Sequence, residues 1–142
     1  EGIEKKKIPE LSGYSQIRSE IKYGKNSRLD LLLSNEKYSC YVEIKNVSLV
    51  ENGDYLFPDA VTSRGQKHLD ELMNIIKEGH RAVMLFIIQR NDGNIFRPAA
   101  GIDPVYSQKL KIAYEKGVEI LPYCAEVTPQ KIEISKPVEF AL

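Results

Sequence analysis

Two acids and a lysine interrupt two apolar stretches of this chain. Asp30 lies in the segment Ser-Arg-Leu-Asp-Leu-Leu-Leu, and Glu43 and Lys45 lie in the segment Tyr-Val-Glu-Ile-Lys. Both segments predict β-strands, because apolar residues flank each charge and no helical period is present. A charge inside an apolar strand needs a partner. Two acids and a lysine on consecutive strands can converge, and such a group suits a hard divalent cation and a phosphodiester.

Strand geometry predicts that these charges share one surface. Side chains alternate between the two faces of a strand, so Glu43 and Lys45 point the same way. The polar connection at residues 34–39 is short enough for a hairpin, and this pairing places Asp30 on the same surface. The opposite, apolar surface is predicted to contain Leu29, Leu31, Leu33, Val42 and Ile44. A plain alternative is a cross-strand salt bridge between Asp30 and Lys45 on a solvated face, worth roughly 0.2–1 kcal/mol.

Composition predicts one soluble globular domain. The chain has 142 residues, of which 42% are hydrophobic and 28% charged, both ordinary values for such proteins. The 20 basic and 20 acidic residues cancel, so a site for a polyanion must be a local patch. The longest apolar run, residues 82–88, is too short for a membrane span of about 20 residues. No signal peptide is recognised, and Cys40 and Cys124 are interpreted as reduced core residues of a cytoplasmic protein.

The remaining elements alternate between strand and helix. The first helix is predicted within residues 58–79, with Thr62 or Ser63 as its cap and Gly79 at its end. One face of this helix contains Leu69, Leu72, Met73 and Ile76. Strands are predicted at residues 16–23, 28–33, 40–49, 81–89, 118–127 and 131–135, and turns at 24–27, 52–53 and 128–130. A second helix begins at Asp103-Pro104 and stops at Gly117, and residues with Gly93 and Pro98 form a loop. The order predicts an α/β domain with a mixed sheet flanked by helices.

The start of the first helix is a candidate anion site. Free N–H groups and the positive end of the helix dipole favour a phosphate there. The segment from residue 64 reads Arg-Gly-Gln-Lys-His, so Arg64, Gln66, Lys67 and His68 are candidates for contacts with DNA. A solvated helix start is the alternative, and His68 is interpreted as a phosphate contact or a helix-packing histidine, not as a metal ligand. Asp59, in the preceding loop, is interpreted as a cap or loop contact. The alternative is that it supports the metal-binding acids without touching the metal.

The order of elements, with Asp on the second strand and Glu-x-Lys on the third, resembles the PD-(D/E)xK nucleases, a restriction-endonuclease-like fold. Leu29 occupies the position of the proline in that motif. Longer segments resemble the sugar fermentation stimulation (SfsA-like) family between about residues 8 and 136. They are Tyr-Gly from residue 23, Phe-Pro-Asp-Ala-Val-Thr from residue 57, Arg-Gly-Gln-Lys-His-Leu from residue 64 and Gly-His-Arg-Ala-Val from residue 79. Leu31 departs from the phenylalanine usual after the motif's aspartate.

The resemblance implies a domain organisation and a role for each residue of the site. An OB-like domain normally precedes the nuclease-like domain, so residues 1–7 are expected to be a linker remnant and residues 8–142 the single nuclease-like domain. Asp30 and Glu43 are implied ligands of Mg²⁺ or Mn²⁺, and Lys45 would act on the phosphate or position the attacking water. Glu20 matches the place of a third acid in the superfamily, or is a solvated strand charge.

The resemblance also implies a partner. Family members are regarded as DNA-binding proteins with a regulatory role in sugar metabolism. The expected function is therefore DNA binding with a magnesium-dependent phosphodiesterase site, and Arg28 joins the helix residues as a candidate DNA contact. One alternative is a non-cleaving DNA-binding regulator that inherited the nuclease fold. Another is an interaction domain with a vestigial site.

Overall fold

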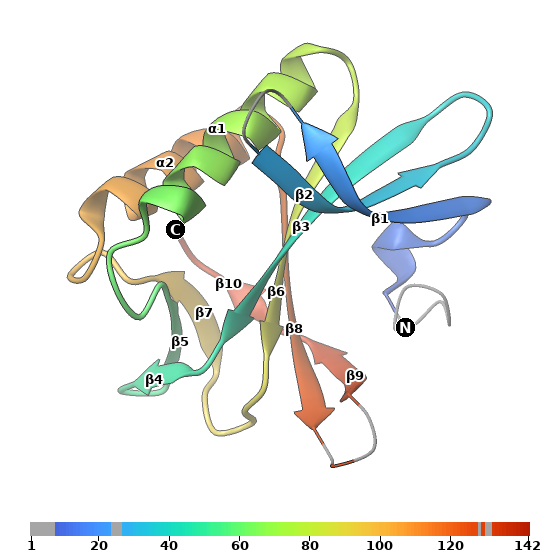
Figure 1. Ribbon diagram of the computed structural model, residues 1–142. Coiled ribbons are helices and arrows are strands. Elements are labelled where there is room, and N and C mark those ends of the chain that lie inside the picture. The colour runs from blue at the N-terminus through green and yellow to red at the C-terminus, as the bar shows by residue number, and fades with distance from the viewer. Residues whose placement is uncertain (1–7, 24–26, 128, 130–131) are drawn as a thin grey trace.

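The computed structural model describes residues 8–23, 27–127, 129 and 132–142 (Figure 1). The predicted linker at residues 1–7 and most of the predicted turns at 24–27 and 128–130 lie outside these residues. The first half contains η1 (Pro9–Leu11), β1 (Gln16–Tyr23), β2 (Ser27–Ser34), β3 (Ser39–Val47), β4 (Leu49–Glu51), β5 (Asp54–Phe57) and α1 (Ser63–Lys77). The second half contains β6 (Arg81–Ile88), β7 (Ile95–Pro98), α2 (Pro104–Glu115), β8 (Glu119–Val127), β9 (Ile132–Pro137) and β10 (Glu139–Phe140).

A six-stranded mixed sheet organises the molecule, as the sequence predicts. Its strand order is β1-β2-β3-β6-β8-β9. Strands β1, β2 and β3 are antiparallel neighbours, because short connections join them, whereas β3, β6 and β8 are parallel. Helix α1 lies between β3 and β6 in the chain, and α2 between β6 and β8. Helix α1 packs on β3 and β6, α2 packs beside α1 and contacts β7, and residues of both helices share the core on this face of the sheet (Figure 1).

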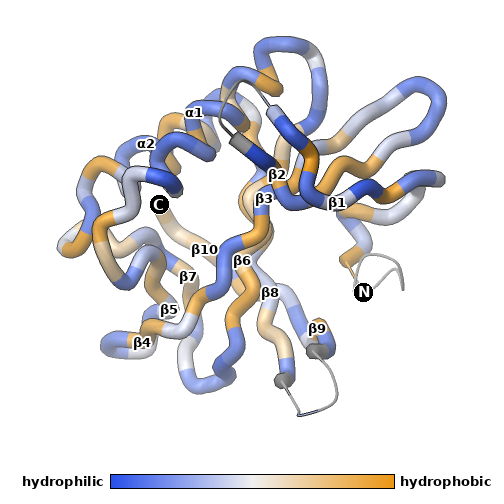
Figure 2. Tube along the Cα trace, in the orientation of Figure 1, coloured by the Kyte–Doolittle hydropathy of each residue, from blue (hydrophilic) through white to orange (hydrophobic). Residues whose placement is uncertain are grey.

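The two faces of the sheet bury separate cores. The β6 residues Ala82, Met84, Phe86 and Ile88 face the helices, while Val83, Leu85 and Ile87 belong to the opposite core with Ile8 and Leu11. A strand buried on both faces reads as the continuous apolar run seen in the sequence. The hydrophobic colours in Figure 2 follow β6 through the middle of the molecule, whereas the turn between β4 and β5 is hydrophilic. Both cysteines are free and buried, as predicted.

The prediction for Leu29 is wrong. Leu31 and Leu33 pack in the core away from the helices, but Leu29 is buried in the helix-side core. The β2–β3 pairing runs from Ser34–Ser39 only as far as Leu31–Val42. At the next position the Ile44 N–H donates to the side chain of Asp30. The regular alternation of faces therefore does not extend past Asp30.

A second sheet, of order β10-β7-β5-β4, was not predicted. Its strands are only two to four residues long, and β7 occupies the segment predicted as a loop around Gly93 and Pro98. Such strands are too short to show a period, and turn residues dominate their neighbourhood. The first helix also starts later than residue 58. Thr62 caps it as predicted, whereas Asp59 is exposed and does not.

Of the helices that the structure describes, neither has the length and apolar character that crossing a bilayer requires.

Candidate functional site

Asp30, Glu43 and Lys45 meet on the helix-facing side of the sheet, where β2 and β3 separate. The Ile44 N–H donates to Asp30 Oδ2 at 2.7 Å, which fixes the Asp30 carboxyl group beside β3. Glu43 is only 3% exposed. Its Oε2 lies 3.1 Å from Lys45 Nζ, so the buried carboxylate has a cationic partner. The exposed Asp30–Lys45 salt bridge, the plain alternative, is therefore not the arrangement found.

Helix α1 contributes a fourth side chain to this group. His68, 3% exposed, lies with Nδ1 2.6 Å from Glu43 Oε2 and 3.0 Å from Lys45 Nζ. The sequence left open whether His68 contacts a phosphate or packs inside, and the structure places it inside, against the acid and the lysine. We call Asp30, Glu43, Lys45 and His68 the carboxylate cluster.

The surroundings shift the pKa values of the two acids of the cluster in opposite directions. Burial, together with the charge of Glu43 and a hydrogen bond to it, raises the pKa of Asp30, although the Ile44 N–H opposes the change. Burial also acts to raise the pKa of Glu43, but the hydrogen bond from His68 and the charge of Lys45 outweigh it and lower that pKa. Glu43 therefore ionises more readily, and Asp30 less readily, than the same acid does in water. A cation between the carboxylates would relieve the same repulsion.

Asp103 anchors the start of α1. This carboxylate is 1% exposed and caps α2 by accepting the Tyr106 N–H at 2.9 Å. It also accepts the Thr62 N–H at 2.9 Å and the side-chain amide of Gln66 at 3.0 and 3.1 Å. Burial acts to raise the pKa of Asp103, but these N–H groups outweigh it and lower the pKa. The carboxylate therefore ties the first turn of α1 to the first turn of α2.

Close packing at Gly65 brings the two helices together at this end. A Cβ at this position would lie 2.8 Å from Thr62 Cγ2 and 3.2 Å from the ring of Tyr106, so a larger residue would push α1 away. Thr62 Oγ1 accepts the Gly65 N–H at 2.9 Å. The position of His68 thus depends on glycine and on the caps of two helices.

The other predicted site residues divide into exposed and inward-facing groups. Arg28, Arg64 and Lys67 are exposed, so their side chains are available to a large ligand. Gln66 is engaged by Asp103, and its DNA contact stays a prediction. Glu20 is exposed on β1 with φ 54°, and it does not join the carboxylate cluster.

Sequence reasoning missed the anchoring role of Asp103. The Asp-Pro pair predicts the cap of α2, which is confirmed. Nothing in the local sequence shows that the same carboxylate also accepts hydrogen bonds from Thr62 and Gln66, which precede it by 41 and 37 residues.

The residues present fit a hard cation with few protein ligands. Among the described residues, no group of three or more His, Cys, Asp or Glu side chains is arranged to hold a metal ion. Mg²⁺ keeps several waters and needs only one or two carboxylates. Glu43 Oε1 is buried and receives no N–H donor from any described residue, and the carboxyl group of Asp30 adjoins Glu43. A buried oxygen without a donor, beside a second carboxylate, suits a cation.

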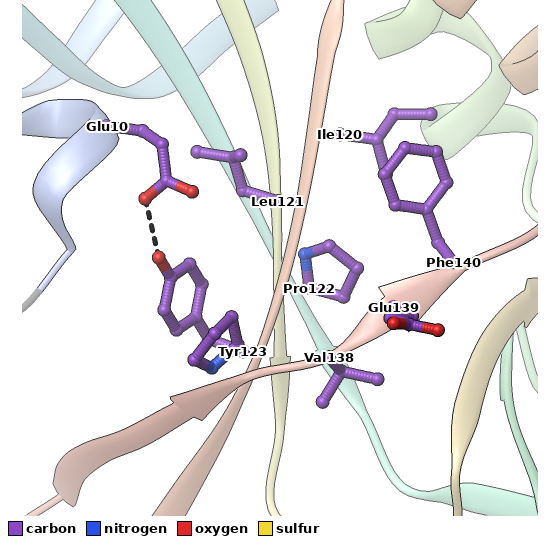
Figure 3. Close-up of a pocket in the computed structure, with 9 residues that line it drawn as sticks. Glu10, Ile120, Leu121, Pro122, Tyr123, Val138, Glu139 and Phe140 are labelled. Carbon is purple, nitrogen blue, oxygen red and sulfur yellow. Dashed lines mark hydrogen bonds between the residues drawn. The ribbon is translucent and has the colours of Figure 1, made fainter.

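A pocket lies away from the carboxylate cluster. It has a volume of about 380 Å³ and opens between β8 and the β9–β10 segment (Figure 3). Its walls include Leu121, Val138 and Phe140 together with Glu10 and Glu139, and the Tyr123 hydroxyl donates to Glu10 at 2.5 Å. Two glutamates disfavour a phosphate, so this pocket does not compete with the carboxylate cluster as a site for nucleic acid.

Comparisons with known proteins agree on one family. The family model described as the sugar fermentation stimulation protein RE domain matches residues 1–131. A sugar fermentation stimulation protein homolog of Citrifermentans bemidjiense is 60% identical over 129 residues, which are 91% of this chain and 56% of the relative. The homolog of Geobacter sulfurreducens is 54% identical over 136 residues, 96% of this chain and 58% of the relative. The chain therefore spans just over half the length of these relatives.

A solved structure gives the same result. Pyrococcus furiosus SfsA, solved in complex with Ca²⁺, superposes with a TM-score of 0.90 at 33% sequence identity. The match covers 99% of this chain and 61% of the other. The mixed sheet with its helices is thus a restriction-endonuclease-like fold, as the sequence predicts.

Proposed function

Because the chain belongs to the sugar fermentation stimulation protein family, we propose that it binds DNA and hydrolyses phosphodiester bonds with the help of a divalent cation. The proposed reaction site is the carboxylate cluster. The same proposal includes the statement that this chain shares the activity and partners of its longer relatives.

One observation supports the proposal above all others. Asp30 and Glu43 are adjacent acids, Glu43 Oε1 is buried without a donor from the described residues, and Lys45 Nζ lies 3.1 Å from Glu43. Most buried polar atoms have a hydrogen-bond partner, so a buried carboxylate oxygen without an N–H donor suits a cation. A phosphodiesterase needs this combination, because acids hold the cation and a lysine stabilises the phosphate.

Three residues of the cluster have a proposed role in the reaction. Asp30 and Glu43 would hold Mg²⁺ or Mn²⁺, and a bound cation would lower the pKa of a water molecule and polarise the phosphate. Lys45 donates to the phosphate oxygen on which negative charge develops. The homologous Pyrococcus furiosus structure was solved with Ca²⁺, a cation that prefers oxygen ligands as Mg²⁺ does.

A second candidate function is DNA binding without cleavage, in a protein that regulates sugar metabolism. The observation that favours it is the ion pair of Lys45 Nζ with Glu43 Oε2, at 3.1 Å. A lysine held in this way is not free to reach a phosphate until the cluster rearranges.

A cleavage assay separates the two functions. We expect the chain to nick supercoiled DNA in Mg²⁺ or Mn²⁺, and to lose this activity completely in EDTA, because two carboxylates alone cannot stabilise the developing phosphate charge. The assay is a time course on supercoiled, single-stranded and branched DNA. If DNA is bound but stays intact on all three substrates with either cation, the chain is a binder and the hydrolase proposal fails.

For the DNA interface, we expect the Arg64→Ala, Lys67→Ala double variant to bind DNA more weakly than the parent. Both residues are exposed at the start of α1, on the helix that also carries His68. Each phosphate contact adds about 0.9 to the slope of log affinity against log salt, so the double variant should show a shallower slope. Fluorescence anisotropy across a salt series measures both quantities.

The matched control is the Lys77→Ala, Lys111→Ala double variant, which removes the same charge from two exposed positions outside the start of α1. Equal losses in the two double variants would show that net charge, and not a local patch, determines binding.

A further inference from the structure

We propose that His68 is a positioning residue that decides which oxygen of Glu43 is free to bind the cation. The inference rests on the proposed function, since it assumes that Glu43 is a metal ligand. It assigns His68 a role within the site, in place of the contact with DNA that the sequence predicts.

The two oxygens of Glu43 have unequal surroundings. Oε2 has two nitrogen neighbours, His68 Nδ1 at 2.6 Å and Lys45 Nζ at 3.1 Å. Oε1 is equally buried and receives no N–H donor from the described residues, and the carboxyl group of Asp30 adjoins Glu43. Nitrogen donors therefore hold the carboxylate by one oxygen, which leaves the other oxygen available to a cation shared with Asp30.

Of the two nitrogen neighbours, His68 is the one that fixes the orientation. Its distance to Oε2 is the shorter, so its Nδ1 proton belongs to Glu43. Its side chain is 4% exposed, against 16% for Lys45, and an imidazole has only two rotatable bonds where a lysine has four. A rigid buried ring holds a carboxylate in one rotamer more strictly than a flexible ammonium group does.

Contacts at the start of α1 fix the helix that carries His68. Gly65 allows α1 to approach Tyr106 closely, and Asp103 accepts hydrogen bonds from the Thr62 N–H and the Gln66 side-chain amide in the first turn of α1. Hydrogen bonds thus tie the first turn of α1 to α2, and the same helix carries His68 to Glu43. Groups that orient a metal ligand in this way typically change metal affinity about 10–100-fold when removed.

The test measures Mn²⁺ affinity by calorimetry, and thermal stability alongside it, in the 142-residue chain. His68→Leu keeps the volume of the buried side chain but removes the donor, and we expect Mn²⁺ binding to weaken by about 10–100-fold. His68→Asn places an amide N–H near the position of Nδ1, and we expect it to restore affinity close to that of the parent. A residue that only packs would give the opposite order, because leucine fills a buried site better than asparagine does.

Two comparisons make the result decisive. His80, the other histidine, is exposed, so His80→Ala should leave Mn²⁺ affinity unchanged and excludes binding by surface imidazole. Parental affinity in His68→Leu, or equal weakening in His68→Leu and His68→Asn, overturns the inference alone. Absence of Mn²⁺ binding in the parent overturns the proposed function and this inference with it. Mn²⁺ binding in the expected order without DNA cleavage supports the role of His68 and rejects hydrolysis.

Discussion

Replacing Lys45 with alanine is expected to lower the rate of DNA cleavage by about 10²–10³-fold while DNA affinity changes little. The proposed contact of Lys45 is with charge that develops on the phosphate only in the transition state. Loss of such a contact lowers kcat more than it raises KM. Single-turnover cleavage rates and anisotropy titrations on the same DNA measure the two quantities separately.

A matched control for this variant is Lys37→Ala. Lys37 is exposed in the loop between β2 and β3, so its removal subtracts the same charge outside the cluster. Cleavage should continue at the parental rate in this control. Equal rates for the parent and Lys45→Ala, with Mg²⁺ present, would show that the lysine only neutralises Glu43 and does not take part in the reaction.

The second large effect is expected for Asp30→Asn, which should abolish cleavage and weaken Mn²⁺ binding without destabilising the protein at pH 7. Asparagine loses the charge that a cation needs, but its side-chain oxygen can still accept the Ile44 N–H. Burial, with Glu43 beside it, raises the pKa of Asp30 above the ordinary value of 3.8. An acid with a raised pKa in the folded state stabilises the fold less when it is ionised than when it is protonated.

The stability of Asp30→Asn relative to the parent should increase as the pH rises. Below the ordinary pKa, Asp30 is protonated in both the folded and the unfolded states, so its ionisation does not affect stability. As the pH rises through the raised pKa, ionisation beside Glu43 lowers the free energy of unfolding of the parent. Relative to the parent, Asp30→Asn should therefore gain stability between about pH 4 and 7 in EDTA, as measured by urea unfolding. A variant that is less stable than the parent at pH 7 in EDTA would contradict this electrostatic account.

The strands that carry the acids were predictable because apolar residues surround each acid in the local sequence. Apolar residues around Asp30 and Glu43 predict strands, and the structure contains β2 and β3 at these positions. The mixed sheet follows from the order of strands and helices, since parallel neighbours need a crossover helix. A long segment with a clear apolar pattern can be predicted as a strand or a helix from its own residues.

The parts that the sequence did not reveal depend on contacts between distant segments. The face of Leu29 depends on a side-chain hydrogen bond from Asp30 to Ile44, which interrupts the pairing of two strands. The inward position of His68 depends on the angle between α1 and the sheet, and hence on Asp103. A helix pattern shows which residues share a face, but not which buried acid that face will meet.

The bonds of Asp103 have a consequence for the order in which the molecule assembles. A nascent chain that has left the ribosome only as far as β7 already contains both acids, the lysine and His68. It lacks the carboxylate that fixes the first turn of α1. Contacts between distant segments form late, because the loop between them must close first. The cluster therefore reaches its final geometry only after α2 has been synthesised and docked, so an unfinished chain carries the reactive groups without the framework that aligns them.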